Sequence, residues 1–189
     1  MAENNDAKNV STAKPVIAGA IFTAPLGTTI PTKVSDTLDT AFKNIGFISD
    51  DGWTNSRNIT TEKKKAWGNQ TVYNAQTDAT DDFKFKMLEY KKAGTKELIY
   101  GKNHVTVDTT TGEITTEVTT EEPEHVIIVI DEILSNGAKQ RTVVFDAQLS
   151  ALGDITHADN ELLMYDVTYS ALPDANGVSH KEYLLPKTH

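Results

Sequence analysis

Three long runs with the residue pattern of β-strands follow one another in the C-terminal half of the chain. They are EHVIIVIDEIL (124–134), KQRTVVFDAQLSALGDI (139–155) and ELLMYDVTYSALPDANG (161–177), with turns at Asn136-Gly137 and around Gly153. Each run is longer than the five or six residues of an average strand. No motif typical of an active site interrupts them. The pattern therefore favours strands that build an extended surface.

Strict alternation predicts which side chains of these strands face a core, because successive residues of a strand point to opposite faces. A fourth segment, DDFKFKMLEY (81–90), also alternates, with Lys84 and Lys86 on its wet face. The predicted core-facing residues are Phe83, Phe85, Met87, Val143, Phe145, Ala147, Leu149, Leu163, Tyr165, Val167, Tyr169 and Ala171. The opposite faces are mainly polar and are expected to meet water or a lumen.

The N-terminal half predicts shorter elements. A first strand is expected within Val16–Pro25, and a helix of one or two turns from Ser35, with Leu38, Ala41, Phe42 and Ile45 on one face and Gly46 beyond its end. NIGFISDDGW (44–53) predicts a brief strand that ends in a turn at Asp50-Asp51-Gly52. TVYNAQTD (71–78) and DDFKFKMLEY predict a pair of strands.

Residues 93–100 are the best helix candidate, with Leu98 and Ile99 as packing residues and Gly101 just past the end. The threonine-rich segment 104–122 predicts a hairpin that turns at Thr111-Gly112. The whole pattern predicts a mainly β protein, with a β-sandwich or barrel-like core, one short flanking α-helix, a long loop and extended termini.

The chain is expected to form one β-rich domain over residues 16–175, flanked by two extensions. Residues 1–15 are polar and poor in aliphatic side chains, which predicts a flexible N-terminal arm. Residues 176–189 form a C-terminal extension whose VSHKEYLLPKTH segment is expected to add a strand elsewhere, for example on a neighbour.

Residues 52–70 predict a long loop or a projecting hairpin with an unusual combination of side chains. A loop of this length is uncommon in a compact domain unless it has a function or is disordered. Aromatic and basic side chains on a projecting segment suggest contact with another surface, although the tryptophans of a solvated loop can also fold back onto the domain. The residues in question are Trp53, Arg57, Lys63, Lys64, Lys65 and Trp67.

Composition narrows the possible functions. The formal net charge of −9 disfavours a surface that grips nucleic acid through many phosphates, although such acidity also serves ordinary solubility. The chain has no cysteine, which excludes a disulfide framework, a thiolate metal cage and a cysteine nucleophile. Neither a signal peptide nor an apolar run long enough to span a membrane is evident, so synthesis in the cytoplasm and no membrane insertion are expected.

A search for catalytic or metal-binding motifs gives no positive result. None of the five histidines forms the i, i+4 pair of a helical metal site. Asp154, His157, Asp159 and Glu161 are close in sequence, but their spacing fits no calcium loop. Neither a phosphate-binding glycine loop nor a nucleophile elbow is present. No catalysis and no cofactor are therefore expected.

The order of five segments resembles that of the major tail tube proteins of long-tailed bacteriophages. The segments are AGAIFTAPLGTTIPT (18–32), AFKNIGFISDDGWTNS (41–56), KKAWGNQTV (64–72), DFKFKMLE (82–89) and GDITHADNELLMYDVTYSALPDANG (153–177). The resemblance extends over roughly Ala18 to Tyr183. It implies a structural virion protein that assembles into stacked hexameric rings, in which the inner strands of neighbouring protomers join into one β-barrel around a channel for DNA.

The resemblance also assigns expected roles to residues. The loop 52–70 and the termini would connect successive rings, and deletion of Trp53–Trp67 is expected to spare the fold and abolish stacking. An electronegative channel would keep DNA from adhering as it passes. The expected channel-facing acids are Asp82, Glu89, Asp131, Asp146 and Asp166, with Lys84 and Lys86 as opposing charges.

The implied partners are further copies of the chain, a tape measure protein, a tail terminator and tail tip or baseplate proteins. DNA would pass through without specific binding. Two other readings stay open at this stage: a soluble β-sandwich module that binds a carbohydrate or protein through the Trp53/Trp67 loop, and an enzyme whose site has no recognisable motif.

Overall fold

The computed structural model describes residues 5–16 and 20–187, and its regular secondary structure consists mainly of strands. One α-helix, α1 (Ala93–Tyr100), and two 3₁₀ turns, η1 (Ala7–Asn9) and η2 (Lys102–His104), accompany them. The strands are β1 (Ala13–Pro15), β2 (Ile21–Pro25), β3 (Lys43–Asn44), β4 (Ile48–Lys65), β5 (Thr71–Met87), β6 (Val105–Val107), β7 (Ile114–Thr116), β8 (Val126–Leu134), β9 (Lys139–Leu152), β10 (Tyr165–Ala171) and β11 (His180–Leu185). The mainly β fold predicted from the sequence is confirmed.

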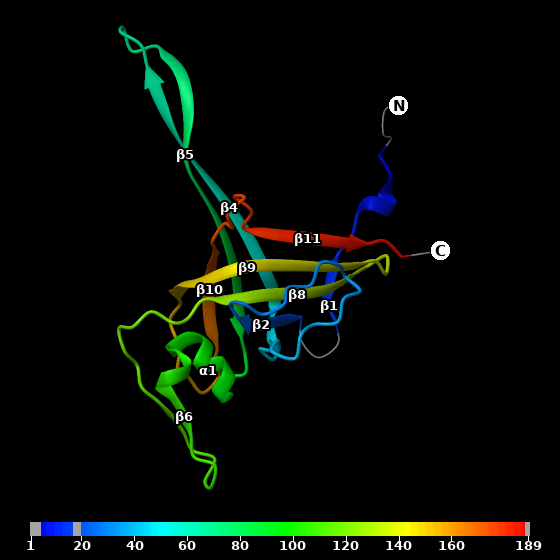
Figure 1. Ribbon diagram of the computed structural model, residues 1–189, viewed down its shortest axis with the longest axis vertical. Coiled ribbons are helices and arrows are strands. Elements are labelled where there is room, and N and C mark those ends of the chain that lie inside the picture. The colour runs from blue at the N-terminus through cyan, green and yellow to red at the C-terminus, as the bar shows by residue number, and fades with distance from the viewer. Residues whose placement is uncertain (1–4, 17–19, 188–189) are drawn as a thin grey trace.

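Nine strands form one antiparallel sheet in the order β3-β2-β8-β9-β10-β5-β4, with β1 added to β8 and β11 added to β9. Strand β9 joins the two halves of this sheet. Its first half pairs with β8 and β11, and its second half pairs with β10. In Figure 1, β8, β9 and β11 cross the direction of β10, β5 and β4 steeply, so the sheet turns over on itself into two layers.

The main core lies between these two layers. Phe83, Phe85 and Met87 of β5 lie beside Tyr169, Val167 and Tyr165 of the paired strand β10. All six are at most 2% exposed and pack against the aliphatic side chains of β2 and β8. Phe85 and Tyr169 stack with ring centroids 5.8 Å apart. The alternation predicted for β5 and β10 is therefore confirmed, with Lys84 exposed and Lys86 half-buried on the opposite face.

The predicted face assignment of β9 is wrong beyond Phe145. Val143 and Phe145 belong to a second core on the other side of the β2-β8-β9 layer, whereas Ala147 and Leu149 join Val144 in the main core. The cause is a bulge, since Ile128 pairs with Val144 and Val126 with Ala147, which leaves an additional residue in β9. One additional residue reverses the side-chain alternation.

The helix predicted from Ser35 is also wrong. The segment forms turns and the short strand β3, although Phe42 and Ile45 are buried as their spacing suggested. The Asp36 carboxylate accepts hydrogen bonds from the backbone N–H groups of Thr32 and Lys33, and Asp39 Oδ1 accepts one from Ala41 N. Such local side-chain bonds compete with helical backbone bonds, so the segment covers the second core as an irregular loop.

Two predictions for the segment 48–87 need correction. Asp50-Asp51-Gly52 does not end a strand, because β4 continues through it with an irregular register between Ile48 and Trp53, and Gly52 takes a φ of 72°. Residues 71–87 form one strand and not a pair. The region 52–70 therefore belongs to a projecting hairpin, the second of the two forms expected for it, and comprises most of β4 and the tip.

Helix α1 occupies the predicted residues 93–100 and lays Ile99 and Leu98 on the main core. The threonine-rich hairpin is confirmed as β6 and β7, with Val105 opposite Thr116 and Gly112 at a φ of 75° in the turn. Figure 1 shows both elements at the end of the molecule away from the β4–β5 tip.

Both predicted extensions contribute strands to the domain itself. Within 1–15, β1 pairs with β8 and the Ser11 hydroxyl accepts a hydrogen bond from Ser135 N, while residues 1–4 lie outside the described part. Within 176–189, β11 pairs with β9 of the same chain, with His180 opposite Val144. Residues 188–189, and 17–19 of the predicted first strand, also lie outside the described part.

A buried carboxylate, Asp81, ties β11 to the base of the long hairpin. Its oxygens accept hydrogen bonds from Ser179 Oγ at 2.6 Å and Asn55 Nδ2 at 2.7 Å and contact His180 Nδ1 at 2.5 Å. Burial raises the pKa of Asp81, but the bonds from Ser179, Asn55 and His180 outweigh burial and hold it below its ordinary value. The charged form is therefore the stabilising one.

Asp81→Asn is expected to lower the free energy of unfolding by about 1–3 kcal/mol at pH 7. Because the folded pKa is depressed, the carboxylate stabilises above the unfolded value of about 3.9 and loses this effect as pH falls through the folded pKa. Urea unfolding of both proteins between pH 3 and 7 measures this. A difference that stays constant below pH 4 would contradict the assigned role.

Candidate assembly surfaces

The β4–β5 hairpin is the most prominent surface feature of the molecule. Its outer part leaves the body and ends in a tip far from every other element (Figure 1). Residues 54–74 are all exposed, so these parts of the two strands do not depend on contacts with the core. The backbone ladder from Trp53 opposite Phe85 to Lys65 opposite Thr71 holds the hairpin extended.

The end of the hairpin is a closed turn. Ala66 N donates to Gln70 O at 2.8 Å and Asn69 N donates to Ala66 O at 3.0 Å. Gly68 and Asn69 both take a positive φ, which glycine and asparagine tolerate best. The Lys65 ammonium donates to Asn69 Oδ1 at 2.7 Å across the turn. The tip is thus a defined structure that presents its side chains to solvent.

The two tryptophans singled out in the sequence lie at opposite ends of the hairpin. Trp53 is half-buried at the base, where its ring stacks on Phe83 at 5.8 Å and its Nε1–H donates to Glu132 Oε1 at 2.9 Å. Trp67 lies at the tip and is completely exposed. The strand between them advances about 40 Å at about 3.3 Å per residue. They cannot share one ligand site, which disfavours the binding-module reading.

Trp53 therefore anchors the hairpin to the body, and its partner Glu132 is only 9% exposed. Burial raises the pKa of Glu132, the hydrogen bond from Trp53 opposes this, and the negative charge of Glu182 adds to it. A raised folded pKa means that the charged carboxylate costs stability as pH rises above the unfolded value of about 4.3.

Two substitutions separate these effects. Trp53→Phe keeps an aromatic ring but leaves Glu132 without its donor, and is expected to cost about 1–3 kcal/mol. Glu132→Gln keeps an acceptor without the charge, and is expected to raise the melting temperature at pH 7 but not at pH 4. Thermal unfolding of both variants at the two pH values tests this, and a Glu132→Gln protein that is less stable at pH 7 would contradict it.

The remaining loop candidates follow the hairpin outward. Arg57 lies opposite Asp81 in the ladder, near the base. Lys63, Lys64 and Lys65 lie next to the tip and are exposed, with the Lys64 ammonium 2.6 Å from Glu62. The structure thus brings the three lysines and Trp67 together and leaves Trp53 and Arg57 apart from them.

A second surface is the outer face of the four-stranded part of the sheet, β9-β10-β5-β4. Its side chains are those that alternate with the core residues of each strand, and none is a large apolar residue. They are Gln148, Asp166, Thr168, Ser170, Asp82, Lys84, Lys86, Thr54 and Ser56. This set, called the wet face below, is broad and polar.

Two of the five expected channel acids lie on the wet face. Asp82 accepts a hydrogen bond from Ser170 Oγ at 2.6 Å, and Asp166 lies 3.6 Å from the Lys84 ammonium. Lys86 pairs with Asp51 at 2.6 Å. The wet face thus carries two acids and two lysines, and Asp51 adds a third carboxylate beside Lys86.

The other three acids each have a partner of their own. Asp131 holds Arg141 through two hydrogen bonds of 2.6 and 2.8 Å, and Asp146 contacts His125 Nδ1 at 2.8 Å. Glu89 accepts a hydrogen bond from Phe47 N and pairs with Lys92 at 3.2 Å. The structure therefore does not bring the five acids together on one face.

Two free sheet edges flank the wet face. Strand β4 pairs only with β5, and within the described residues no strand pairs with 148–152 of β9 on the side away from β10. Neighbouring strands are antiparallel throughout, so β4 and β9 run in opposite directions. Exposed edges of this kind invite pairing with another chain.

Two searches for other functions give no site. Within residues 5–16 and 20–187, no group of three or more histidine or acidic side chains lies close enough to hold a metal. The same part of the chain contains no helix long and apolar enough to cross a membrane. The sequence analysis did not identify residues 148–152 of β9 as a free sheet edge. The length of the 139–155 run was the only feature that could have indicated this edge.

Comparison with known families finds a match over nearly the whole chain. The family model described as Phage tail tube protein matches residues 1–188. A comparison with curated protein sequences finds no match. The match includes the long hairpin, the helix and both sheet edges, in agreement with the resemblance noted in the sequence. The chain therefore belongs to the phage tail tube protein family.

Proposed function

We propose that this tail tube protein forms rings by joining the β4 edge of one protomer to the 148–152 edge of β9 in the next. The observation that carries the proposal is the four-stranded sheet with a polar outer face and two free edges. Because β4 and β9 run in opposite directions, edge-to-edge joining continues the antiparallel pattern. Head-to-tail contacts of this type close into rings when the rotation fits.

In such a ring the wet face lines the channel and the main core lies behind it. Six protomers would contribute 24 strands, four each, and closure would remove the exposed edges. The near balance of Asp51, Asp82 and Asp166 against Lys84 and Lys86 gives phosphates no continuous basic surface. DNA would therefore pass without specific binding.

The projecting hairpin is the proposed connector between rings. The hairpin extends far beyond its contacts with the body, and Trp67 lies at its tip beside Lys63, Lys64 and Lys65. We infer that the assembled tube meets a tape measure protein inside it and terminator and tip proteins at its ends. Synthesis would take place in the host cytoplasm, before incorporation into the virion tail.

Electron microscopy of the concentrated purified protein, alone and with a tail initiator complex, tests the proposal. Stacked rings or hollow tubes are expected, and sedimentation should show a large species whose amount rises with protein concentration. A protein that remains monomeric under both conditions would contradict the proposal. Glycan binding by that monomer would instead favour the binding-module alternative.

A further inference from the structure

The segment 105–124 is strongly and uniformly acidic. It contains six acidic residues and neither lysine nor arginine, the acids being Asp108, Glu113, Glu117, Glu121, Glu122 and Glu124. The β6–β7 hairpin forms its first part, and Glu117 N donates to His104 O at 2.8 Å to hold its continuation against η2. This segment is called the acidic strip below.

Three of the acids in the strip have no partner to balance them. Glu121 contacts His104 at 3.0 Å, Glu122 accepts from Gln148, and Asp108 accepts from backbone N–H groups of its own turn. Glu113, Glu117 and Glu124 are exposed, and no ion pair to them is found among the described residues. The charge of the strip is thus available to another molecule.

The hairpin tip has the opposite charge. Residues 63–73 contain three lysines and no acid, together with the exposed Trp67 and Tyr73. The whole chain has 18 basic and 27 acidic residues, so 15 basic and 27 acidic residues remain once the tip lysines are set aside. The tip is therefore a basic and aromatic exception on an acidic protein.

The tip and the acidic strip lie at opposite ends of the molecule. Figure 1, drawn with the longest axis vertical, shows the β4–β5 tip at the top and the β6 hairpin at the bottom. Within one chain they cannot meet. Copies stacked along this axis bring the tip of one next to the strip of another, and repeated head-to-tail contacts of this kind build a filament.

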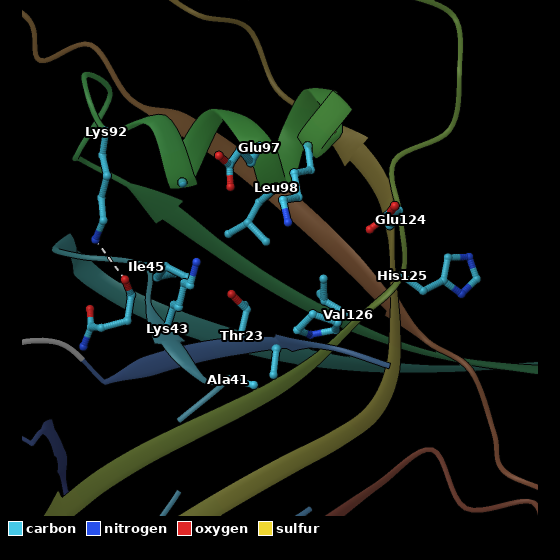
Figure 2. Close-up of a pocket in the computed structure, with 15 residues that line it drawn as sticks. Thr23, Ala41, Lys43, Ile45, Lys92, Glu97, Leu98, Glu124, His125 and Val126 are labelled. Atoms are coloured by element: carbon cyan, nitrogen blue, oxygen red, sulfur yellow. Dashed lines mark hydrogen bonds between the residues drawn. The ribbon is translucent and has the colours of Figure 1, made fainter. Parts of the chain in front are cut away.

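A largely apolar pocket adjoins the strip. Its volume is about 300 Å³, and it lies between α1 and the ends of β2 and β8, with Ile45, Leu98 and Val126 among its lining residues. Figure 2 shows Glu124 at its rim and Leu98 of α1 pointing into it. Glu124 belongs to both the strip and the pocket, so the two form one continuous surface.

We propose that the acidic strip and this pocket receive the hairpin tip of a second copy, with the lysines of the tip on the glutamates of the strip and Trp67 in the pocket. The inference rests on the proposed stacking of rings and adds its receiving surface. Exposed aromatic residues are the usual anchors of such contacts, and complementary charges orient them.

Charge reversal with rescue tests the pairing. Lys63→Glu/Lys65→Glu and, separately, Glu113→Lys/Glu117→Lys are expected to reduce tube formation at least about tenfold, and the combined variant is expected to restore it. Lys14→Glu/Lys139→Glu, which changes equally exposed lysines away from both surfaces, is the matched control and is expected to assemble normally. Circular dichroism verifies the fold of each variant.

The outcomes distinguish the two levels of the account. Normal assembly of both reversed variants, or a combined variant that does not regain assembly, overturns the pairing. If the wild-type protein still forms tubes in that case, the proposed function stands. A wild-type protein that forms neither rings nor tubes overturns the proposed function itself.

Cross-linking tests the position of the tip directly, because the chain has no cysteine of its own. In a Gln70→Cys/Glu124→Cys protein, a short bismaleimide is expected to join copies into a ladder of covalent multimers after assembly. Gln70→Cys/Ala175→Cys, with the second cysteine on an exposed turn, is the control and is expected to give no ladder. Equal ladders from both proteins, or a ladder from the control alone, would overturn the proposed contact.

Discussion

A protein in which residues 58–80 are replaced by Asn-Gly is expected to fold normally and to form no tubes. The replacement joins Arg57 to Asp81, which lie opposite each other in the ladder, and Asn-Gly favours the two-residue turn that such a hairpin needs. Residues 58–80 are exposed apart from the half-buried Ala75, so their loss removes almost no core contact. The melting temperature is expected to change by only a few degrees.

Electron microscopy and sedimentation at the concentration where the wild type assembles provide the readout. Tube formation is expected to be lost almost completely, while isolated rings remain possible. The shortened protein keeps Trp53, because a deletion of Trp53–Trp67 would also remove the contacts of Trp53 with Phe83 and Glu132. A loss of tubes could then result from a destabilised fold as well as from a loss of stacking. Normal tubes from the shortened protein would exclude the hairpin as the ring connector.

Assembly is expected to slow hydrogen exchange at the two free sheet edges at least about a hundredfold. The affected amides are the outward-facing ones of 53–57 in β4 and of 148–152 in β9, because each gains a strand partner from a neighbouring protomer. The inner strands β5 and β10 are already paired on both sides and gain no backbone hydrogen bond on assembly, so their exchange rates are expected to change much less.

Comparison of monomer and tube by mass spectrometry or NMR measures this effect. Strand β11 is the internal control, since it is an edge of the same sheet that the ring contact does not use. Protection of β11 with unchanged exchange in β4 and β9 would mean that rings close through other edges.

The sequence predicted those elements whose local pattern has one physical interpretation. Helix 93–100 has the adjacent packing residues Leu98 and Ile99 and a glycine past its end, and β5 and β10 have one apolar and one polar face. In each case propensity, periodicity and burial agree, and the structure confirms the prediction.

The failures have physical causes in particular residues. The bulge near Phe145 is invisible in the sequence because Val143 and Val144 are both buried, in cores on opposite faces, and apolar residues suit either. The helix expected from Ser35 has the right spacing of apolar residues, but Asp36 and Asp39 use their carboxylates to form turns. These turns cover the second core, on the outer side of the β2-β8-β9 layer.

The candidate surfaces were only partly predictable. The lysines and Trp67 could be recognised because aromatic and basic residues in a polar segment are unusual, and the Gly68-Asn69 pair is a turn signal that points to the hairpin form. The separate role of Trp53 depends on Phe83 and Glu132, which are distant in sequence. The pairing of acids with Arg141, His125 and Lys92 likewise depends on the tertiary fold.

Cryo-electron microscopy of the assembled tube tests the central claim most directly. The account predicts a hollow tube of sixfold rings whose channel is lined by β9, β10, β5 and β4 of each protomer, with β4 hydrogen-bonded to residues 148–152 of its neighbour. Asp82, Lys84, Lys86 and Asp166 should face the channel. A tube whose channel is lined by the β2-β8 layer, or whose rings leave β4 unpaired, would contradict it.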